Sequence, residues 1–235
     1  MLLVAEIGLN HDGNWDLACE LIRLAKWAGA DIAKFQLGWR SKPDEMNHID
    51  YDRGMKLKAA CASTGVEFMA SLFTEDALKL AHDLELERYK IASRTVVDDP
   101  RLCERILAEG KPTYVSLGMW GGKGFPFGNP DGKVLHYIFC RSKYPTTAKD
   151  LADMPRQFGH HGYFGYSDHL LGTEACLLAI ARGARYVEKH FTINKASQVI
   201  RDHVLSASPG EFKELAEIGR PLAQLVEMIR TGSQR

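Results

Sequence analysis

Short apolar runs alternate with amphipathic stretches along almost the whole chain. Runs rich in β-branched and apolar residues predict strands, and stretches with apolar residues three or four positions apart predict helices. The predicted strands are Leu2 to Glu6, Asp31 to Gln36, Val66 to Ser71, Arg88 to Ser93, Pro112 to Leu117, Val134 to Cys140, Tyr163 to Ser167 and Tyr186 to Phe191. The predicted helices are Trp15 to Ala28, Tyr51 to Thr64, Glu75 to Leu84, Pro100 to Glu109, Gly172 to Arg182 and Pro209 to about Arg230.

This regular alternation of strand and helix predicts a parallel sheet, and eight such units close an α/β TIM barrel, the (β/α)8 fold. The 235 residues fit one TIM-barrel domain spanning 1–235, because such barrels run to roughly 200 to 250 residues. Two stretches interrupt the rhythm. Residues 119–132 are so rich in Gly and Pro that we expect a loop in place of a helix, and residues 146–162 allow one or two helical turns between Lys149 and Phe158.

Charge and cysteine content narrow the classes of partner. Thirty basic and 30 acidic residues give a formal net charge of zero, so we expect no nucleic acid and no membrane among the partners. The five cysteines are scattered without a Cys-x-x-Cys pair, which favours a reducing compartment. An acidic residue already at position 6 argues against a signal peptide, and no apolar run is long enough to span a bilayer. We expect a cytoplasmic protein.

Two histidines stand at the carboxyl ends of predicted strands. His169 ends the cluster Ser167-Asp168-His169, and His190 ends Glu188-Lys189-His190. Because the chemistry of a (β/α) barrel lies at the carboxyl ends of its strands, this pair predicts a metal site there. The alternative is that each imidazole is only a hydrogen-bonded group at a strand end.

Two lysines, Lys34 and Lys90, lie within predicted strands, where apolar residues are expected. Buried ammonium groups need anionic partners. Further polar residues stand at strand ends, namely Glu6, Gln36, Ser71, Ser93, Ser116, Ser142 and Ser167. Lysines and serine hydroxyls together predict a pocket for a phosphate or carboxylate. In the alternative interpretation Lys34 pairs with Glu6 across adjacent strands and Lys90 lies on the rim.

A series of short motifs makes the sequence recognisable. In chain order they are Glu6-Ile7-Gly8-Leu9-Asn10-His11-Asp12-Gly13, Ala28-Gly29-Ala30-Asp31 leading to Lys34-Phe35-Gln36, Tyr89-Lys90-Ile91-Ala92-Ser93, Gly110-Lys111-Pro112, Ser116-Leu117-Gly118-Met119, Tyr144-Pro145-Thr146, Gly165-Tyr166-Ser167-Asp168-His169 and Glu188-Lys189-His190-Phe191-Thr192. The series closely resembles the sialic acid synthase family, the phosphoenolpyruvate-dependent synthases of nine-carbon sugar acids. The resemblance extends from Ala5 to about Leu215.

The resemblance implies a barrel that condenses phosphoenolpyruvate with the aldehyde of an N-acylated hexose and releases phosphate. It implies a divalent metal ion, usually Mn²⁺ with Mg²⁺ or Co²⁺ as alternatives, bound by His169 and His190. The roles that it implies for other residues are phosphoenolpyruvate or substrate binding for Lys34, Gln36, Ser71, Lys90, Ser93, Ser116, Ser142 and Ser167, proton handling for Glu6, shaping of the sugar site for Tyr144, and an acidic contact after the last strand for Asp202.

The chain departs from the family pattern in two places. Ser93-Arg94-Thr95 stands where members usually have Ser-Gly-Glu, so Thr95 replaces a carboxylate expected against the sugar. Typical members also continue past the barrel into a small antifreeze-like domain that covers the sugar of a partner subunit. We therefore expect altered selectivity for the aldose, and a homodimer or a separately encoded cap domain as a partner beside the two small-molecule substrates.

Two alternative functions remain open at this point. A barrel aldolase would use Lys34 or Lys90 as a Schiff-base nucleophile and needs no metal. A catalytically silent relative would bind a sugar phosphate or a partner protein without turnover. Trapping with borohydride would identify the first alternative, and phosphate release from phosphoenolpyruvate would exclude the second.

Overall fold

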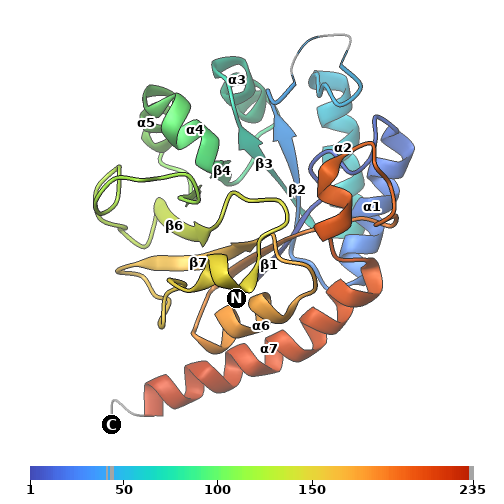
Figure 1. Ribbon diagram of the computed structural model, residues 1–235. Coiled ribbons are helices and arrows are strands. Elements are labelled where there is room, and N and C mark those ends of the chain that lie inside the picture. The colour runs from blue at the N-terminus through green and yellow to red at the C-terminus, as the bar shows by residue number, and fades with distance from the viewer. Residues whose placement is uncertain (41, 43–44, 233–235) are drawn as a thin grey trace.

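The strands form a closed parallel barrel, as the sequence predicts (Figure 1). The computed structural model describes residues 1–40, 42 and 45–232. In chain order, which is also the order around the barrel, the strands are β1 (Leu2–Glu6), β2 (Ile32–Leu37), β3 (Glu67–Leu72), β4 (Tyr89–Ile91), β5 (Thr113–Ser116), β6 (Leu135–Cys140), β7 (Tyr163–Asp168) and β8 (Tyr186–His190). The pairing of β8 with β1 closes the barrel.

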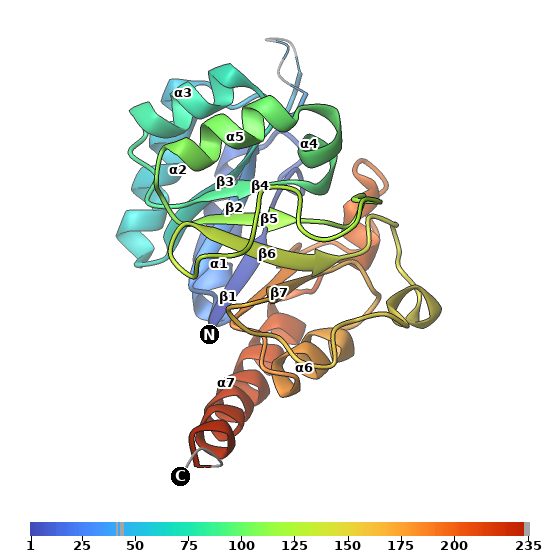
Figure 2. The ribbon, with the colours of Figure 1, turned by 90° about the vertical axis from the view of Figure 1, so that its left-hand side faces the viewer.

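Helices surround the barrel and follow most of the strands (Figures 1 and 2). They are α1 (Trp15–Trp27), α2 (Tyr51–Thr64), α3 (Glu75–Asp83), α4 (Ser93–Asp98), α5 (Pro100–Ala108), α6 (Glu174–Ala181) and α7 (Pro209–Gly232), with the 3₁₀ turns η1 (Ala148–Leu151) and η2 (Arg201–Leu205). The last helix, α7, packs against α1 and α6. Within the described part of the chain, no helix is both long and apolar enough to cross a membrane.

Apolar side chains form two separate layers. The larger lies between the strands and the surrounding helices. The smaller lies inside the barrel and consists of Val4, Ile32, Met69, Tyr114, Ile138 and Tyr186. Because side chains alternate between the two faces of a strand, residues two and four positions further along also point inward, toward the carboxyl end. On β2 these are Lys34 and Gln36, so the chain changes from apolar to polar on one face of the same strand.

The long connection between β5 and β6 contains no helix, which confirms the expected loop. Phe125 of this loop stacks on Tyr137 with the ring centroids 4.2 Å apart and meets Tyr163 edge-on at 5.5 Å. The hydroxyl of Tyr137 also accepts a hydrogen bond from the backbone N–H of Phe127. Aromatic residues of the loop thus cover a part of the sheet that a helix would otherwise cover.

The segment around Ser93 differs from the prediction. The fourth strand ends at Ile91, and Ser93 begins the short helix α4 instead of closing the strand. The predicted strand, Arg88 to Ser93, thus extended two residues too far, and no helix was predicted over residues 93–98. In residues 146–162 the only described helical element is η1, which is about one turn, at the lower end of the one or two turns expected, and begins one residue before Lys149. Pro155 shortly after it lacks the N–H that a continuing helix needs.

Candidate active site at the carboxyl end of the barrel

A cavity of about 220 Å³ opens at the carboxyl ends of the strands. Every site residue predicted from the sequence lines it, namely Glu6, Lys34, Gln36, Ser71, Lys90, Ser93, Ser116, Ser142, Tyr144, Ser167, His169, His190 and Asp202. No role was predicted for the other lining residues, which are Trp39, Phe73, Ala92, Arg94, Met119, Cys140, Glu188 and Arg201. The geometry therefore brings the predicted residues together.

Two carboxylates and two ammonium groups meet at the bottom of the cavity, and we call Glu6, Lys34, Lys90 and Glu188 the floor. The Lys34 ammonium lies 2.6 Å from the Glu6 carboxylate and 3.6 Å from that of Glu188. Lys90 donates a hydrogen bond to the hydroxyl of Ser116 at 2.6 Å. The alternative pairing of Lys34 with Glu6 is thus present, but Lys90 is 2% exposed and does not lie on the rim.

The two floor carboxyls have opposite pKa shifts. Burial raises the pKa of Glu6 to about 7, although the Lys34 charge partly offsets this effect. Burial also acts to raise the pKa of Glu188, but Lys34 and Lys90 outweigh it, together with hydrogen bonds, and lower this pKa to about 2. Near neutral pH, one carboxyl of the floor can therefore exchange a proton while the other stays ionised.

The two floor lysines also differ. Burial lowers the pKa of Lys90. It acts on Lys34 in the same direction, but the charges of Glu188 and Glu6 outweigh it and raise the pKa of that lysine. Lys34 is consequently a fixed positive charge between two carboxylates, whereas Lys90 is the more easily deprotonated amine.

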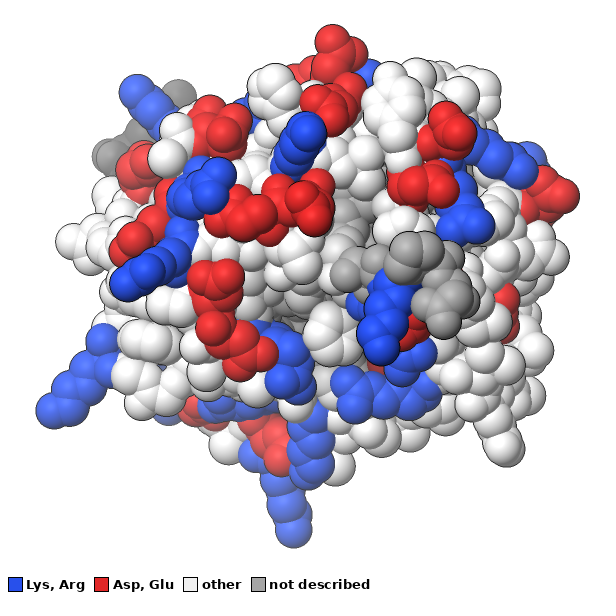
Figure 3. Space-filling model, turned by 90° about the horizontal axis from the view of Figure 1, so that it is seen from above, with Lys and Arg blue, Asp and Glu red and all other residues white. Residues whose placement is uncertain are grey.

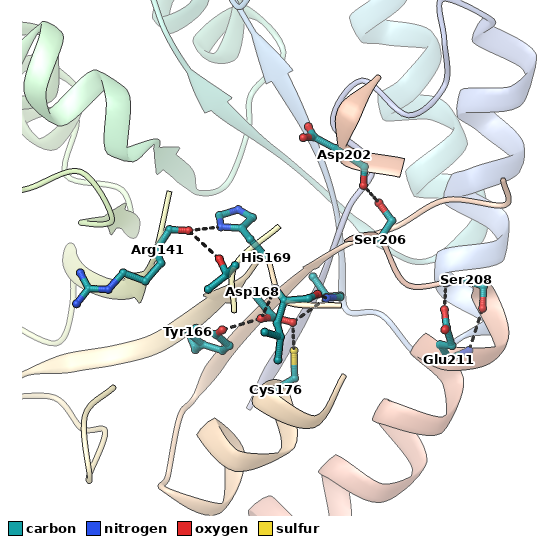
Figure 4. A network of polar contacts seen from close by, with 12 residues as sticks. Arg141, Tyr166, Asp168, His169, Cys176, Asp202, Ser206, Ser208 and Glu211 are labelled. Carbon is teal, nitrogen blue, oxygen red and sulfur yellow. Dashed lines mark hydrogen bonds and ion pairs between the residues drawn. The ribbon is translucent and has the colours of Figure 1, made fainter. Parts of the chain in front are cut away.

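His169 and His190 lie side by side at the ends of β7 and β8, with ring centroids 5.4 Å apart. The Nδ1 of His169 lies 2.7 Å from the carbonyl oxygen of Arg141 (Figure 4). Because a carbonyl only accepts, Nδ1 carries the proton and Nε2 keeps a free lone pair. The Nδ1 of His190 is buried without a partner among the described residues.

Both imidazoles are neutral at physiological pH. Burial lowers the pKa of His169 to about 4 and that of His190 to about 3. Neutral, adjacent imidazoles with available lone pairs fit a divalent metal ion. In the described part of the chain, no group of three or more His, Cys, Asp and Glu side chains is arranged around one metal position. The fit therefore rests on these two imidazoles, which would leave coordination positions open for substrate or water.

An ion pair lies behind the two histidines, on the outward faces of the same strands. The ammonium of Lys189 is 2.7 Å from the carboxylate of Asp168, and both side chains are almost completely buried. Asp168 also accepts hydrogen bonds from the Tyr166 hydroxyl and the Cys176 thiol (Figure 4). Since Asp168 precedes His169 and Lys189 precedes His190, this pair ties together the two strand ends that carry the imidazoles.

Aromatic and acidic side chains complete the wall beside the histidines. The Tyr144 ring lies 4.3 Å from that of His169, and the Arg201 guanidinium lies 4.3 Å from the Tyr144 ring centroid. Asp202 is mostly buried, which raises the pKa of its carboxyl. Ser93, which follows β4, is held in place by a hydrogen bond that the backbone N–H of Gly118 donates to its hydroxyl at 2.8 Å.

The expectation for Thr95 needs correction. Thr95 is 4% exposed and does not line the cavity, so it does not stand against a bound sugar. Arg94, the residue before it, does line the cavity. The departure from the family pattern thus places a guanidinium, that of Arg94, in the cavity wall.

The structure adds functional candidates that the sequence analysis missed. Glu188 stands two positions before His190 on one strand, so the two-residue alternation already predicts that both side chains point into the barrel. Arg94 and Arg201 lie outside the strands, so the two-residue alternation does not predict where their side chains point. Trp39 follows β2 and is far from both arginines in the sequence. Only the folded arrangement places these three around one cavity.

A closed parallel barrel with lysines, carboxylates and paired imidazoles at its carboxyl end defines the class, a (β/α)8-barrel protein with its site where such barrels place their chemistry. A sequence model of the NeuB family matches residues 21–229. The chain belongs to this family and is homologous to the sialic acid synthases, which confirms the resemblance seen in the sequence.

Three comparisons show the degree of similarity. The chain is 31% identical to an uncharacterized protein of Methanocaldococcus jannaschii, over 91% of this chain and 68% of that protein. It is 28% identical to the human N-acetylneuraminate-9-phosphate synthase, over 95% of this chain and 73% of that enzyme. The crystal structure of the N-acetylneuraminic acid synthetase from Leptospira borgpetersenii matches with a TM-score of 0.80 and 25% identity, over 96% of this chain and 84% of that one.

Proposed function

We infer that this protein condenses phosphoenolpyruvate with the aldehyde of an N-acylhexosamine-type aldose, giving a sialic-acid-like 3-deoxy-2-keto sugar acid and inorganic phosphate. The observation that carries this proposal is that the four floor residues and the His169–His190 pair line the same cavity. The family membership supports it, as do relatives named as synthases of N-acetylneuraminic acid 9-phosphate and of pseudaminic acid.

In this reaction C3 of phosphoenolpyruvate bonds to the aldehyde carbon, water adds at C2, and phosphate leaves. Lys34 and Lys90, with the hydroxyls of Ser71 and Ser116 beside them, bind the phosphate and carboxylate of phosphoenolpyruvate. Glu6, whose pKa lies near 7, moves a proton at the aldehyde oxygen or at the attacking water. Glu188 stays ionised and holds Lys34 in place.

His169 and His190 would hold a divalent ion, which we propose to be Mn²⁺, and such an ion would supply a Lewis acid for the aldehyde oxygen. The protein's own part is to keep both imidazoles neutral and oriented. The Arg141 carbonyl fixes the tautomer of His169, and burial prevents protonation of either ring.

A second function is favoured by one observation, the lowered pKa of Lys90. A desolvated lysine in a barrel cavity can attack a carbonyl and form a Schiff base, which is the chemistry of a metal-independent aldolase. Reduction with borohydride in the presence of pyruvate would then attach the substrate covalently to Lys90, and mass spectrometry would locate it. The synthase proposal expects no such adduct.

The decisive experiment measures phosphate release from phosphoenolpyruvate with a panel of aldoses, with Mn²⁺ and with a chelator. We expect release that requires both the aldose and the metal, and a Lys90→Met variant with a raised KM for phosphoenolpyruvate but a nearly unchanged KM for the aldose. Release without aldose, or equal effects of Lys90→Met on both KM values, would contradict the proposal.

A further inference from the structure

Two arginines line the cavity, and the reaction described above uses neither. Arg94 follows β4, and its guanidinium lies 5.9 Å from the ring centroid of Trp39, which follows β2. Arg201 follows β8, and its guanidinium lies 4.3 Å from the ring of Tyr144, which follows β6. We call these four residues the rim.

The rim has one arginine on each of two opposite walls. In a closed barrel of eight strands, β4 is four strands from β8 and β2 is four strands from β6. Each guanidinium lies over an aromatic ring, and such stacking restricts its motion while its N–H groups remain free to donate. The rim therefore presents two partly fixed cationic groups to a molecule that lies between the walls.

Neither arginine is strongly engaged by a protein carboxylate. Arg94 is 3.6 Å from Asp98, with half of its side chain exposed, and Arg201 is 3.6 Å from Asp202, with 71% of its side chain exposed. By comparison, Arg88 contacts Glu67 at 2.5 Å. Both pairs are long and both guanidinium groups are exposed, so an incoming anion can compete for them.

Among the residues that line the cavity, and with their carboxyls ionised, the excess of positive charge lies at the rim. On the floor, Lys34 and Lys90 are matched in number by Glu6 and Glu188. Above the floor, Arg94 and Arg201 stand against the single carboxylate of Asp202 among the cavity-lining residues. Acidic and basic side chains are interspersed over the face seen in Figure 3, so the attraction for an anion is a local property of the rim.

We propose that Arg94 and Arg201 bind an anionic group of the acceptor, so that the preferred aldose carries a phosphate ester or a carboxylate remote from its aldehyde. The inference rests on the proposed function, because it assumes that phosphoenolpyruvate occupies the floor and that the aldehyde lies near the histidines. A planar guanidinium offers two parallel N–H donors, which match the oxygens of either anion. The rim thereby selects the acceptor by charge.

Calorimetry of acceptor binding tests this inference separately from turnover. The probes are N-acetylmannosamine, its 6-phosphate, and N-acetylmannosaminuronic acid, each titrated with Mn²⁺ present and phosphoenolpyruvate absent. We expect at least one charged sugar to bind about tenfold or more tightly than the neutral one. The better of the two charged sugars identifies the group as phosphate or carboxylate. Equal affinity for all three, or no binding of any, overturns the inference.

Variants assign the effect to the rim. Arg94→Gln and Arg201→Gln should each remove most of the preference for the charged sugar while leaving the affinity for N-acetylmannosamine and for phosphoenolpyruvate within about twofold. Arg23→Gln, which removes an exposed arginine of α1 paired with Glu20, is the matched control and should change nothing. Equal weakening of phosphoenolpyruvate would assign the arginines to that substrate and overturn the inference.

The two proposals fail in different ways. If phosphate release is never observed but charged sugars bind through Arg94 and Arg201, the synthase proposal fails and the rim assignment stands. If phosphate release occurs with the neutral aldose at the highest kcat/KM and the variants retain it, the synthase proposal stands and the rim assignment fails.

Discussion

The ammonium of Lys34 lies 2.6 Å from the carboxylate of Glu6, and each side chain is only 2% to 3% exposed. Across the floor the same ammonium is 3.6 Å from Glu188. One lysine thus stands between two carboxyls that are almost completely buried. Removal of one partner from such a buried group leaves an uncompensated charge, which is costly in free energy.

We expect Lys34→Met to lower the free energy of unfolding by about 3 kcal/mol or more, because Glu188 then loses a cationic neighbour while it remains buried. Denaturation in urea at pH 7 measures the loss. The double variant Lys34→Met, Glu188→Gln should recover part of it. Lys56→Met is the control, since its partner Asp16 is fully exposed, and should leave the stability nearly unchanged. A Lys34→Met variant as stable as the unmodified protein would contradict the role given to this pair.

Glu6→Gln should affect the chemical step more than binding. The amide keeps the shape of the side chain but cannot exchange a proton, so we expect kcat to fall by about 10² to 10⁴ while the KM for phosphoenolpyruvate changes little. Steady-state phosphate release gives both constants. A rise in KM with unchanged kcat would instead show that Glu6 only positions substrate.

His169→Gln and His190→Gln should each weaken the binding of Mn²⁺ by a factor of about ten or more, because each removes one of two imidazole ligands. Electron paramagnetic resonance of free Mn²⁺ measures this without any need for activity. His82→Gln, on α3 and outside the cavity, serves as the control. The predicted metal site is wrong if the two site variants bind Mn²⁺ as the unmodified protein does.

His11 should make the stability depend on pH. It is completely buried against Trp15, and burial lowers its pKa from 6.5 to about 4. Because the unfolded chain binds the proton at higher pH, the stabilising effect is full above pH 6.5 and is lost as the pH falls toward 4. This difference in pKa corresponds to about 3 kcal/mol.

His11→Leu tests that dependence, because leucine does not titrate. We expect the difference in unfolding free energy between the variant and the unmodified protein to shift in favour of the variant as the pH falls from 6.5 to 4. The comparison cancels the contributions of His169 and His190, whose pKa values are also lowered. Parallel pH profiles for the two proteins would contradict the prediction.

Much of the fold and of the candidate site follows from local sequence patterns. The two-residue alternation that buries Ile32 also turns Lys34 into the barrel, and the same rule applies to Tyr186 and Glu188 on β8. Local patterns fail where tertiary contacts decide. Arg201 lies in a 3₁₀ turn, and its position over Tyr144 depends on two loops more than 50 residues apart in sequence. The helix that begins at Ser93 was not predicted, because it has only six residues and its N-terminus has no side-chain cap that would mark it in the sequence.

The ion pair of Asp168 and Lys189 lies outside the cavity but helps to set the separation of the two imidazoles inside it. Each of its members is the chain neighbour of one imidazole and points to the other face of the sheet, toward α6. A substitution at either position can change the separation of the imidazoles, and with it the preferred radius of the ion that we propose they bind, without altering any group that lines the cavity. Differences in metal preference among related barrels can therefore originate in residues hidden behind the sheet, where an inspection of the cavity alone would not find them.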